Sequence, residues 1–598
     1  MGKTFHTWLI HPNDKIKLID FENIENNIFS VVDELSFGKE GSESVKDGSF
    51  RPDITAMING IPLAFLEVKK PDNEGGIQKE FDRMLNQRLK NPDYKKYFNM
   101  LQIVTFSNNM EYEDDDFAFA EDVKAGSFYT TPNGQKTTFS FFREEQPKTT
   151  GFVDISEDKI RSVLKDNHYS PSEYDTPEFQ TNLDGDTPCN RFITSIFDKE
   201  RFLYFIHYGM LFINSHVDEK HIMRYPQFFA SRAIIERLEK GGKKGILWHS
   251  QGVGKTSLSA FCTRILRDFY AKQGITTRFY YVVDRLDLLT QVSGEMSKRG
   301  LHVVNVETKK EFEKELNKAV SSHTAMDSDG EITVVNIQKF DEDLPVAQNA
   351  YNAKVQRIIF VDENHRSYKN DGTFYANLMG VDTEAVFLGL TGTPLLSKKE
   401  RSNLKFGDYI HKYFYDKSIA DGYTLRIKKE AIETTARAEI KKNLELENPT
   451  IGRSELFETD DYIDALCKFI NKDFENFRLT NNDNTIGGMI VCSSNNQAWK
   501  IKNWMDENSK FNVGIVLSDP KLPSAVNKQT QIEFKEGLKI DILVVHQMLT
   551  TGYDVNRLKK MYLLRNAKEH TLLQTISRVN RPYRHTDAKG NLHVYRYG

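Results

Sequence analysis

The sequence predicts an α/β protein in which a β-rich N-terminal part is followed by two tandem α/β units. From about residue 222, nearly continuous apolar runs alternate with helical patterns. Such runs are typical of parallel strands that helices cover on both faces. The pattern restarts after about residue 425, so we expect domains at residues 1–215, 216–425 and 426–598. The apolar runs are 245–248, 279–283, 332–335, 357–361 and 385–388 in the first unit, and 488–491, 513–516 and 540–545 in the second.

The composition argues against several classes of protein. Of the 598 residues, 39% are hydrophobic and 28% are charged, as in ordinary globular domains. The chain has no run of about 18 apolar residues, which argues against a membrane protein. The four cysteines form no CxxC pair, which disfavours a zinc ribbon or a disulfide framework and suits the cytoplasm. The net charge of -4 still allows nucleic-acid binding, because only the groove that meets phosphate must be basic.

A glycine-rich segment, residues 249–256, stands between a predicted strand and a predicted helix. Gly252 and Gly254 let backbone N–H groups turn toward phosphate at a helix N-terminus. Lys255 would reach the β- and γ-phosphates of ATP, and the Thr256 hydroxyl would bind Mg²⁺. The generic pattern has glycine where His249 stands. The residues predicted to hold ATP here are Gln251, Gly252, Val253, Gly254, Lys255 and Thr256.

Two further segments carry charge where ATP hydrolysis needs it. The apolar run 358–361 ends in Asp362 and Glu363. Asp362 is the expected second contact to Mg²⁺, and Glu363 would orient the attacking water as a general base. Near the end of the chain, Arg578 and Arg581 are three residues apart, so a helix would place them on one face. There they would stabilise transition-state charge on the γ-phosphate. The plainer alternative for Asp362 and Glu363 is a solvated acidic turn. For Arg578 and Arg581 it is a salt-bridged surface helix.

A second charged cluster lies in the N-terminal part. Two apolar runs flank Asn59-Gly60, a pair that is typical of a hairpin turn. Glu67 and Lys69 are two residues apart on the second strand, so they share a face. Together with Asp53 they form a set in which two carboxylates hold Mg²⁺ and the lysine positions or activates water against a phosphodiester. The alternative is an ordinary hairpin with charged ends.

The register of this hairpin decides which of the two interpretations is possible. A strict two-residue loop pairs Asp53 with Leu66 and turns its side chain to the wrong face. A three-residue loop or one bulge pairs Asp53 with Glu67 instead. We therefore predict a longer loop or a bulge between Ile54 and Leu66. We also predict that Asp53, Glu67 and Lys69 lie on one face that opens toward solvent or a groove.

The order of the motifs from about residue 222 onward resembles the superfamily 2 helicases and translocases. Residues 224–227 resemble their upstream glutamine motif, in which Gln227 would read adenine. Residues 549–554 resemble a later motif, which implies that Gly552 and Asp554 contact the nucleotide. The resemblance implies that the two α/β units are RecA-like motor lobes.

The whole chain resembles the R subunit, the restriction and motor subunit, of type I restriction endonucleases. In that family a PD-(D/E)xK nuclease domain precedes a two-lobed superfamily 2 motor. Further matches are residues 104–109, 362–367 and 419–423. The resemblance implies ATP-driven movement of double-stranded DNA without strand separation and Mg²⁺-dependent cleavage. It also implies assembly with methyltransferase and specificity subunits in a bacterial cytoplasm.

The chain departs from the family pattern after the nuclease lysine, where a Gln-x-x-x-Tyr helix is common. Gln78 is followed four residues later by Asp82, and Gln87 by Asn91. The candidates for an upstream acidic ligand are Glu22 and Glu25. Chains of this family continue past the arginine motif with a helical region, so we expect a fragment that is truncated at both ends.

Two rival functions are compatible with parts of the sequence. The first is another superfamily 2 helicase or restriction motor, such as a type III restriction subunit. A nuclease that precedes the motor argues against type III, in which the nuclease follows it. The second is a nucleic-acid-binding scaffold whose ATP site only switches conformation and which does not cut DNA. The predicted general base and the two arginines argue against such a scaffold, and DNA-dependent ATP hydrolysis would discriminate the two.

Overall fold

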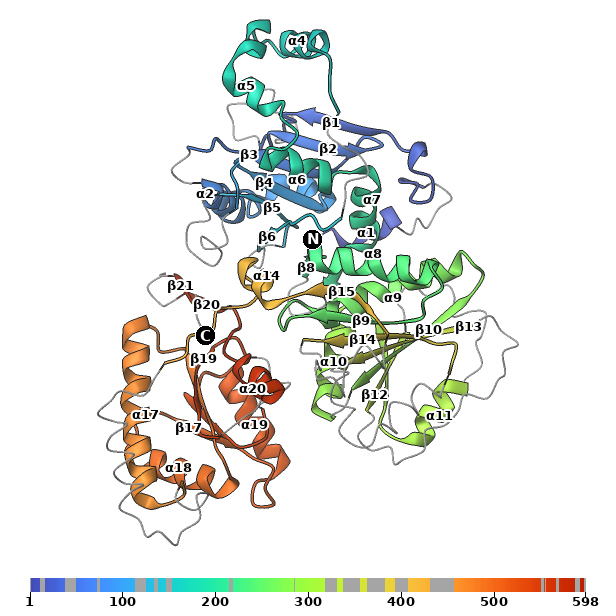
Figure 1. Cartoon of the computed structure of the whole chain (residues 1–598). Helices are drawn as coiled ribbons and strands as arrows, with labels where there is room; N and C mark the ends of the chain where they lie inside the picture. The colour runs from blue at the N-terminus through green and yellow to red at the C-terminus, as the bar shows by residue number, and fades with distance from the viewer. Residues whose placement is uncertain are drawn as a thin grey trace. The chain divides into compact units, whose positions relative to one another are not determined.

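The described strands form one six-stranded, one seven-stranded and one four-stranded sheet, with two small hairpins (Figure 1). The chain divides into two compact units, Met1–His249 with Gly254–Tyr413 and Ser250–Val253 with Phe414–Gly598. No described helix has both the length and the apolarity that crossing a membrane requires. The computed structural model describes residues 2–10, 17–37, 50–72, 76–112, 125–133, 138–146, 153–213, 219–283, 286–317, 331–336, 355–362, 382–392, 407–430, 457–549, 553, 555–565, 569–586 and 592–595.

The N-terminal sheet of the first unit has the strand order β1-β2-β3-β4-β5-β6. Only β3 and β4 run parallel, and helical segments connect them, as a parallel pair requires. Phe65, Phe81 and Phe106 belong to an aromatic core that packs these segments on the sheet. The strands are β1 (Phe29–Asp33), β2 (Ile54–Ile58), β3 (Ile61–Val68), β4 (Ile103–Ser107), β5 (Ser127–Thr130) and β6 (Ser140–Phe141). The connecting segments are α2 (Gly76–Arg83), the π-helical turn η2 (Met84–Arg88), η3 (Pro92–Tyr94) and α3 (Lys95–Met100).

The β2–β3 hairpin contains the predicted bulge. Asn59 and Gly60 both have positive φ, 52° and 77°, as a two-residue primed turn requires. The pairing then shifts between Ala56 and Met57, which leaves Leu63 as the extra residue of β3. Beyond the bulge Ile54 pairs with Leu66, so Asp53 comes opposite Glu67. The bulge is therefore confirmed, and the alternative of a three-residue loop is wrong because Ile58 pairs with Ile61.

Helices and a short hairpin follow the N-terminal sheet. The sequence predicts helices with polar breaks between about 155 and 220, and the structure confirms them up to Tyr208. The elements here are α4 (Glu157–Asp166), η5 (Pro171–Asp175), α5 (Pro177–Asn182), α6 (Pro188–Ile196), α7 (Lys199–Tyr208), β7 (Met210–Ile213) and β8 (Glu219–Ile222). Two further helical segments, α1 (Lys3–Ile10) and η1 (Ile24–Asn26), precede the sheet.

The second sheet of the first unit is parallel throughout, as predicted, and has the order β11-β12-β10-β13-β14-β9-β15. Its strands are β9 (Lys244–His249), β10 (Thr276–Val283), β11 (His302–Val306), β12 (Glu331–Asn336), β13 (Val355–Asp362), β14 (Val386–Thr391) and β15 (Tyr409–Tyr413). The helices are α8 (Tyr225–Glu239), α9 (Lys255–Ala271), α10 (Leu286–Lys298) and α11 (Lys309–Asn317). The carboxyl ends of the neighbours β13, β14 and β9 bring Asp362, Thr391 and His249 to one edge.

The second unit has a parallel sheet with the order β17-β18-β16-β19. This confirms that the α/β pattern restarts late in the chain. The strands are β16 (Gly487–Val491), β17 (Val513–Val516), β18 (Ile542–Val545) and β19 (Leu558–Leu563), with a terminal hairpin of β20 (Arg584–Thr586) and β21 (Leu592–Val594). The helices are α14 (Tyr415–Ala420), α17 (Asp460–Asn481), α18 (Asn495–Asn508), α19 (Ser524–Lys535) and α20 (Glu569–Ile576).

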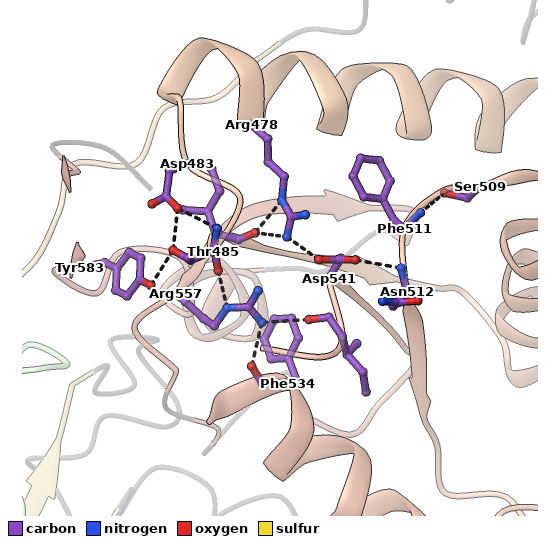
Figure 2. Close-up of polar contacts among 12 residues, drawn as sticks. Arg478, Asp483, Thr485, Ser509, Phe511, Asn512, Phe534, Asp541, Arg557 and Tyr583 are labelled. Carbon is purple, nitrogen blue, oxygen red and sulfur yellow. Dashed lines mark hydrogen bonds and ion pairs between the residues drawn. The ribbon is translucent and has the colours of Figure 1, made fainter. Parts of the chain in front are cut away.

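Two buried arginines bind the ends of these strands and helices together (Figure 2). Arg478 of α17 donates to the Ile486 carbonyl and, at 2.7 Å, to Asp541 Oδ1. Asp541 Oδ2 in turn accepts the backbone N–H of Asn512 at 2.9 Å. Arg557 donates to carbonyl oxygens from three separate segments, those of Thr485, Phe534 and Ile540. Burial of a charge is costly unless hydrogen bonds compensate for it, and these come from a carboxylate and a carbonyl for Arg478 and from carbonyl oxygens for Arg557.

We expect Asp541→Ala to destabilise the second unit by about 3 kcal/mol, because it leaves the buried Arg478 guanidinium without its carboxylate. Urea unfolding followed by the fluorescence of Trp499 and Trp504, both on α18, measures this in a Trp8→Phe, Trp248→Phe background. The matched control is Asp460→Ala, which removes a largely exposed carboxylate paired with Lys500, and it should cost less than about 1 kcal/mol. Equal losses in the two variants would contradict a special role for the buried pair.

Candidate nuclease and nucleotide sites

The β2–β3 hairpin brings the three predicted nuclease residues together. Lys69 Nζ lies 3.3 Å from Glu67 Oε2 and 3.7 Å from Asp53 Oδ2. The backbone N–H of Val68 donates to Asp53 Oδ2 at 2.7 Å, which fixes this carboxylate beside β3. The prediction that Asp53, Glu67 and Lys69 share a face is therefore confirmed. Their catalytic roles remain predictions.

Two residues that the sequence analysis missed complete this cluster. Arg88, at the end of η2, contacts Glu67 Oε1 at 2.6 Å and Glu80 Oε1 at 2.8 Å. Glu80 of α2 lies with Oε2 3.7 Å from Lys69 Nζ. The third carboxylate in the cluster is thus Glu80, whereas the candidate Glu22 pairs with Lys17 at 3.9 Å.

The exposure of the cluster differs from one side chain to the next. Asp53 has 41% of its side chain exposed and Lys69 has 22%, whereas Glu67 has only 2%. The prediction of an open face therefore holds for Asp53 and is wrong for Glu67, because Arg88 and Glu80 cover it. Burial raises the pKa of Glu67, as do Asp53 and Glu80, and this outweighs the lowering by Arg88 and Lys69.

The cluster fits a Mg²⁺ ion that takes few protein ligands. Among the described residues, no three His, Cys, Asp or Glu side chains are placed to share one ion. Mg²⁺ commonly keeps several waters and binds one or two carboxylates together with a substrate phosphate. Asp53 and Glu67 supply two such carboxylates, and their Oδ2 and Oε2 atoms both face the Lys69 amine.

The P-loop segment lies between β9 and α9, as predicted. Gly252 and Gly254 both have φ of +92°, in the left-handed region that favours glycine. A Cβ at Gly254 would stand 2.7 Å from Gln227 Nε2, so another side chain at this position would displace the Gln227 amide. Gln227 Nε2 donates to the Gly254 carbonyl at 2.9 Å, while its Oε1 accepts the Arg224 N–H at 2.9 Å. The structure thus brings Gln227, the predicted adenine reader, to the P-loop.

The surroundings of this segment fit a phosphate ligand. Gly254 is the N-cap of the 17-residue helix α9, whose first residues are Lys255 and Thr256. A helix N-terminus favours anions. The Ser250 hydroxyl and Gln251 Nε2 are buried and have no hydrogen-bond partner among the residues described. Asp362 stands at the carboxyl end of β13, separated from β9 only by β14.

Three predicted nucleotide-site residues cannot be placed. Glu363, Gly552 and Asp554 lie outside the described residues. The general base and the second-lobe contacts therefore remain predictions from the sequence.

The two arginines of the second unit do not share a helix face, and that prediction is wrong. Helix α20 ends at Ile576, because the N–H groups of Arg578 and Val579 bond only three residues back, as in a tight turn. The buried Arg578 donates to the carbonyls of Tyr553 and Gln574, at 3.1 and 3.2 Å. Within the same unit, a Cβ on Gly252 would lie 2.5 Å from Arg581 Nη1.

Three family models match successive parts of the chain. The N-terminal model of the type I restriction enzyme R protein matches residues 3–136. The SWI2/SNF2 ATPase model matches residues 226–455, which implies the use of a nucleotide. The model of domain 3 of the type I restriction enzyme subunit R matches residues 472–597.

Relatives match nearly the whole chain. A proposed type I restriction enzyme endonuclease subunit, MjaIXP of Methanocaldococcus jannaschii, is 27% identical over 97% of this chain and 54% of its own length. The type I restriction enzyme HindI endonuclease subunit of Haemophilus influenzae is 24% identical over 95% of this chain and 53% of its own. This chain therefore spans about half the length of these relatives.

The models that match residues 3–136 and 472–597 both describe parts of the R subunit. The ATPase model matches between them, which is the order that the motifs predict. Both relatives are named as endonuclease subunits of type I restriction enzymes, and each match covers more than nine-tenths of this chain. The chain is therefore similar to the R subunits of type I restriction endonucleases in its N-terminal part, in its last part and over most of its length.

Proposed function

We propose that this protein is an ATP-driven translocase of double-stranded DNA that carries a Mg²⁺-dependent endonuclease. It would act as the restriction and motor subunit of a type I enzyme, with methyltransferase and specificity subunits that choose the target. The observation that carries the proposal is that one chain holds both a glycine-rich phosphate loop and a separate Asp53–Glu67–Lys69 cluster. Four free, separated cysteines suit a cytoplasmic location.

We assign the nuclease and its connecting helices to residues 1–215, and the two motor lobes to residues 216–425 and 426–598. In the first lobe, Lys255 would offset the charge of the β- and γ-phosphates, and Thr256 and Asp362 would hold the accompanying Mg²⁺. Glu363 orients the attacking water, and Arg578 and Arg581 offset the charge that develops on the γ-phosphate. Gln227 fixes the base, and Gly552 and Asp554 contact the nucleotide from the second lobe.

In the nuclease, Asp53 and Glu67 would hold one Mg²⁺, which would supply Lewis-acid chemistry at the scissile phosphodiester. Lys69 lies beside both carboxylates, where its amine orients a water or neutralises the developing negative charge on phosphate. Arg88 and the backbone of Val68 keep the two carboxylates in place. Cleavage needs both carboxylates ionised, so the raised pKa of Glu67 makes Mg²⁺ binding weaken as the pH falls.

Lys255→Ala should lower kcat for ATP hydrolysis by on the order of a hundredfold, because the lysine offsets phosphate charge. The assay is steady-state ATP hydrolysis with and without duplex DNA, and the wild type should be stimulated by the duplex. The control is Lys272→Ala, an exposed lysine at the other end of the same helix. Unchanged hydrolysis by a folded Lys255→Ala variant would refute the motor assignment.

Arg581→Ala should leave the binding of a fluorescent ADP analogue within about threefold and slow hydrolysis by roughly a hundredfold, because the contact strengthens in the transition state. Arg578→Ala should slow hydrolysis as well and also lower the thermal midpoint, because Arg578 holds two backbone carbonyls. Lys528→Ala, an exposed change on α19, is the control. If binding and turnover fall by the same factor, the arginines are ordinary binding residues.

Asp53→Ala or Lys69→Ala should abolish DNA cleavage by the assembled enzyme and spare its ATP hydrolysis, because the two sites use different metal ions and different sheets. The readouts are cleavage of a circular DNA that carries the target and ATP hydrolysis in the same sample. Lys70→Ala changes the exposed neighbour of Lys69 and should affect neither. A loss of ATP hydrolysis in a folded Asp53→Ala variant would contradict the two-site model.

A further inference from the structure

A chain of partly buried hydrogen bonds leads away from the first residue of the P-loop. His249 Nε2 lies 2.9 Å from His411 Nδ1, and His411 Nε2 lies 2.6 Å from Glu145 Oε2. His249 ends β9, His411 belongs to β15, and Glu145 follows β6, the last strand of the N-terminal sheet (Figure 1). Three segments that are distant in sequence therefore meet at the base of the nucleotide site. None of the functions proposed above uses this chain of contacts.

A bulge in β15 aims His411 at His249. Tyr409 pairs with Ile246, and regular pairing would then place His411 opposite Trp248, on the other face of the sheet. The register shifts between Tyr409 and His411, so that His411 comes opposite Leu247 and shares a face with His249. Bulges re-aim side chains in this manner and recur beside functional sites. The contact between the two histidines thus depends on one extra residue, Ile410.

The ring of His249 depends on His411 for its orientation. His249 is fully buried. Burial lowers the pKa of its imidazole well below the ordinary value, and the nearby His411 and Lys255 lower it further, which favours the neutral ring. Its Nδ1 has no hydrogen-bond partner among the described residues. In the tautomer of His411 that donates from Nε2 to the Glu145 carboxylate, His411 Nδ1 accepts the N–H of His249 Nε2.

At the Glu145 end of these contacts, the neighbouring residue bonds to the helices that follow the N-terminal sheet. Glu144, the neighbour of Glu145, contacts Arg201 Nη1 of α7 at 2.6 Å and also binds the hydroxyl of Ser195 in α6. Burial raises the pKa of Glu144, but the bonds from Arg201 and Ser195 outweigh this effect and lower it. Glu144 and Glu145 together form a short strut between the N-terminal sheet with its helices and the motor strand β15.

The backbone of His249 connects this strut to the catalytic lysine. Lys255 Nζ donates to the His249 carbonyl at 3.3 Å, and the P-loop begins at this residue. A shift of the His249 backbone therefore moves the origin of the loop that cradles phosphate. Displacements of about 1 Å in such groups reduce turnover by on the order of a hundredfold, because transition-state contacts are exacting.

We propose that His411 is a positioning residue for ATP hydrolysis, and that the Glu145–His411–His249 chain couples the segment after the nuclease sheet to the P-loop. This inference rests on the proposed function, since it assigns a role within that ATP site. His411 acts through His249 and not on the nucleotide itself. A glycine at position 249, as in the generic P-loop, would have no side chain to receive this contact.

The test is steady-state ATP hydrolysis with duplex DNA, with binding of a fluorescent ADP analogue as a second readout. His411→Ala should lower kcat by roughly tenfold and change KM and analogue affinity by less than about twofold, because positioning matters most in the transition state. His411→Gln keeps one donor and one acceptor and should recover kcat to within about threefold of the wild type. The matched control, His302→Ala, removes an exposed histidine from β11 and should change nothing.

Glu145 provides the second arm of the test. Glu145→Ala should lower kcat by about as much as His411→Ala. The double variant should be no slower than either single variant, because all three break the same series of hydrogen bonds from Glu145 to His249. Additive losses would overturn the proposal, as would a His411→Ala enzyme within twofold of wild-type kcat, or a His411→Gln enzyme as slow as His411→Ala at equal thermal midpoints. Failure of the proposed function looks different, because the wild type would then show no Lys255-dependent hydrolysis.

Discussion

The alternation of side chains along a strand is the constraint on which both candidate sites depend. Because neighbouring residues point to opposite faces, a shift of one residue in register exchanges every side chain of a strand between faces. The bulge at Leu63 brings Asp53 opposite Glu67. The bulge at Ile410 places His411 on the face of His249. In each case one unpaired residue in an otherwise apolar strand determines which polar groups meet.

Burial sets the second constraint, since each polar group that these registers turn inward needs a partner. Glu67 is almost fully buried, and Arg88 supplies the opposite charge while also binding Glu80. In the second unit, Arg478 and Asp541 likewise supply opposite charges to each other. Arg478 also donates to the Ile486 carbonyl, and Asp541 also accepts the Asn512 N–H. Removal of one member costs more than the pair contributes, because the remaining charge stays buried.

The sequence was informative where a local pattern determines the structure. The apolar runs predicted the parallel sheets, and the Asn59-Gly60 turn together with the spacing of Asp53 and Glu67 predicted a longer loop or a bulge, of which the structure has the bulge. Arg88 was missed because the π-helical turn Met84–Arg88 departs from the helical period from which a shared face would be inferred. The helix expected at Arg578 ends at Ile576 because the following backbone forms tight turns instead, which the spacing of charges does not reveal.

The histidine in the P-loop shows why a departure from a motif needs a structural explanation. Glycine is common at such a position because it costs no space, so a buried imidazole there requires a partner for its polar atoms. His411 is the partner of His249 Nε2, and it reaches this atom only through the bulge in β15. His411 in turn binds a carboxylate from outside the motor sheet. The replacement of glycine by histidine therefore makes sense only together with Ile410, His411 and Glu145, and these residues form one unit of structure.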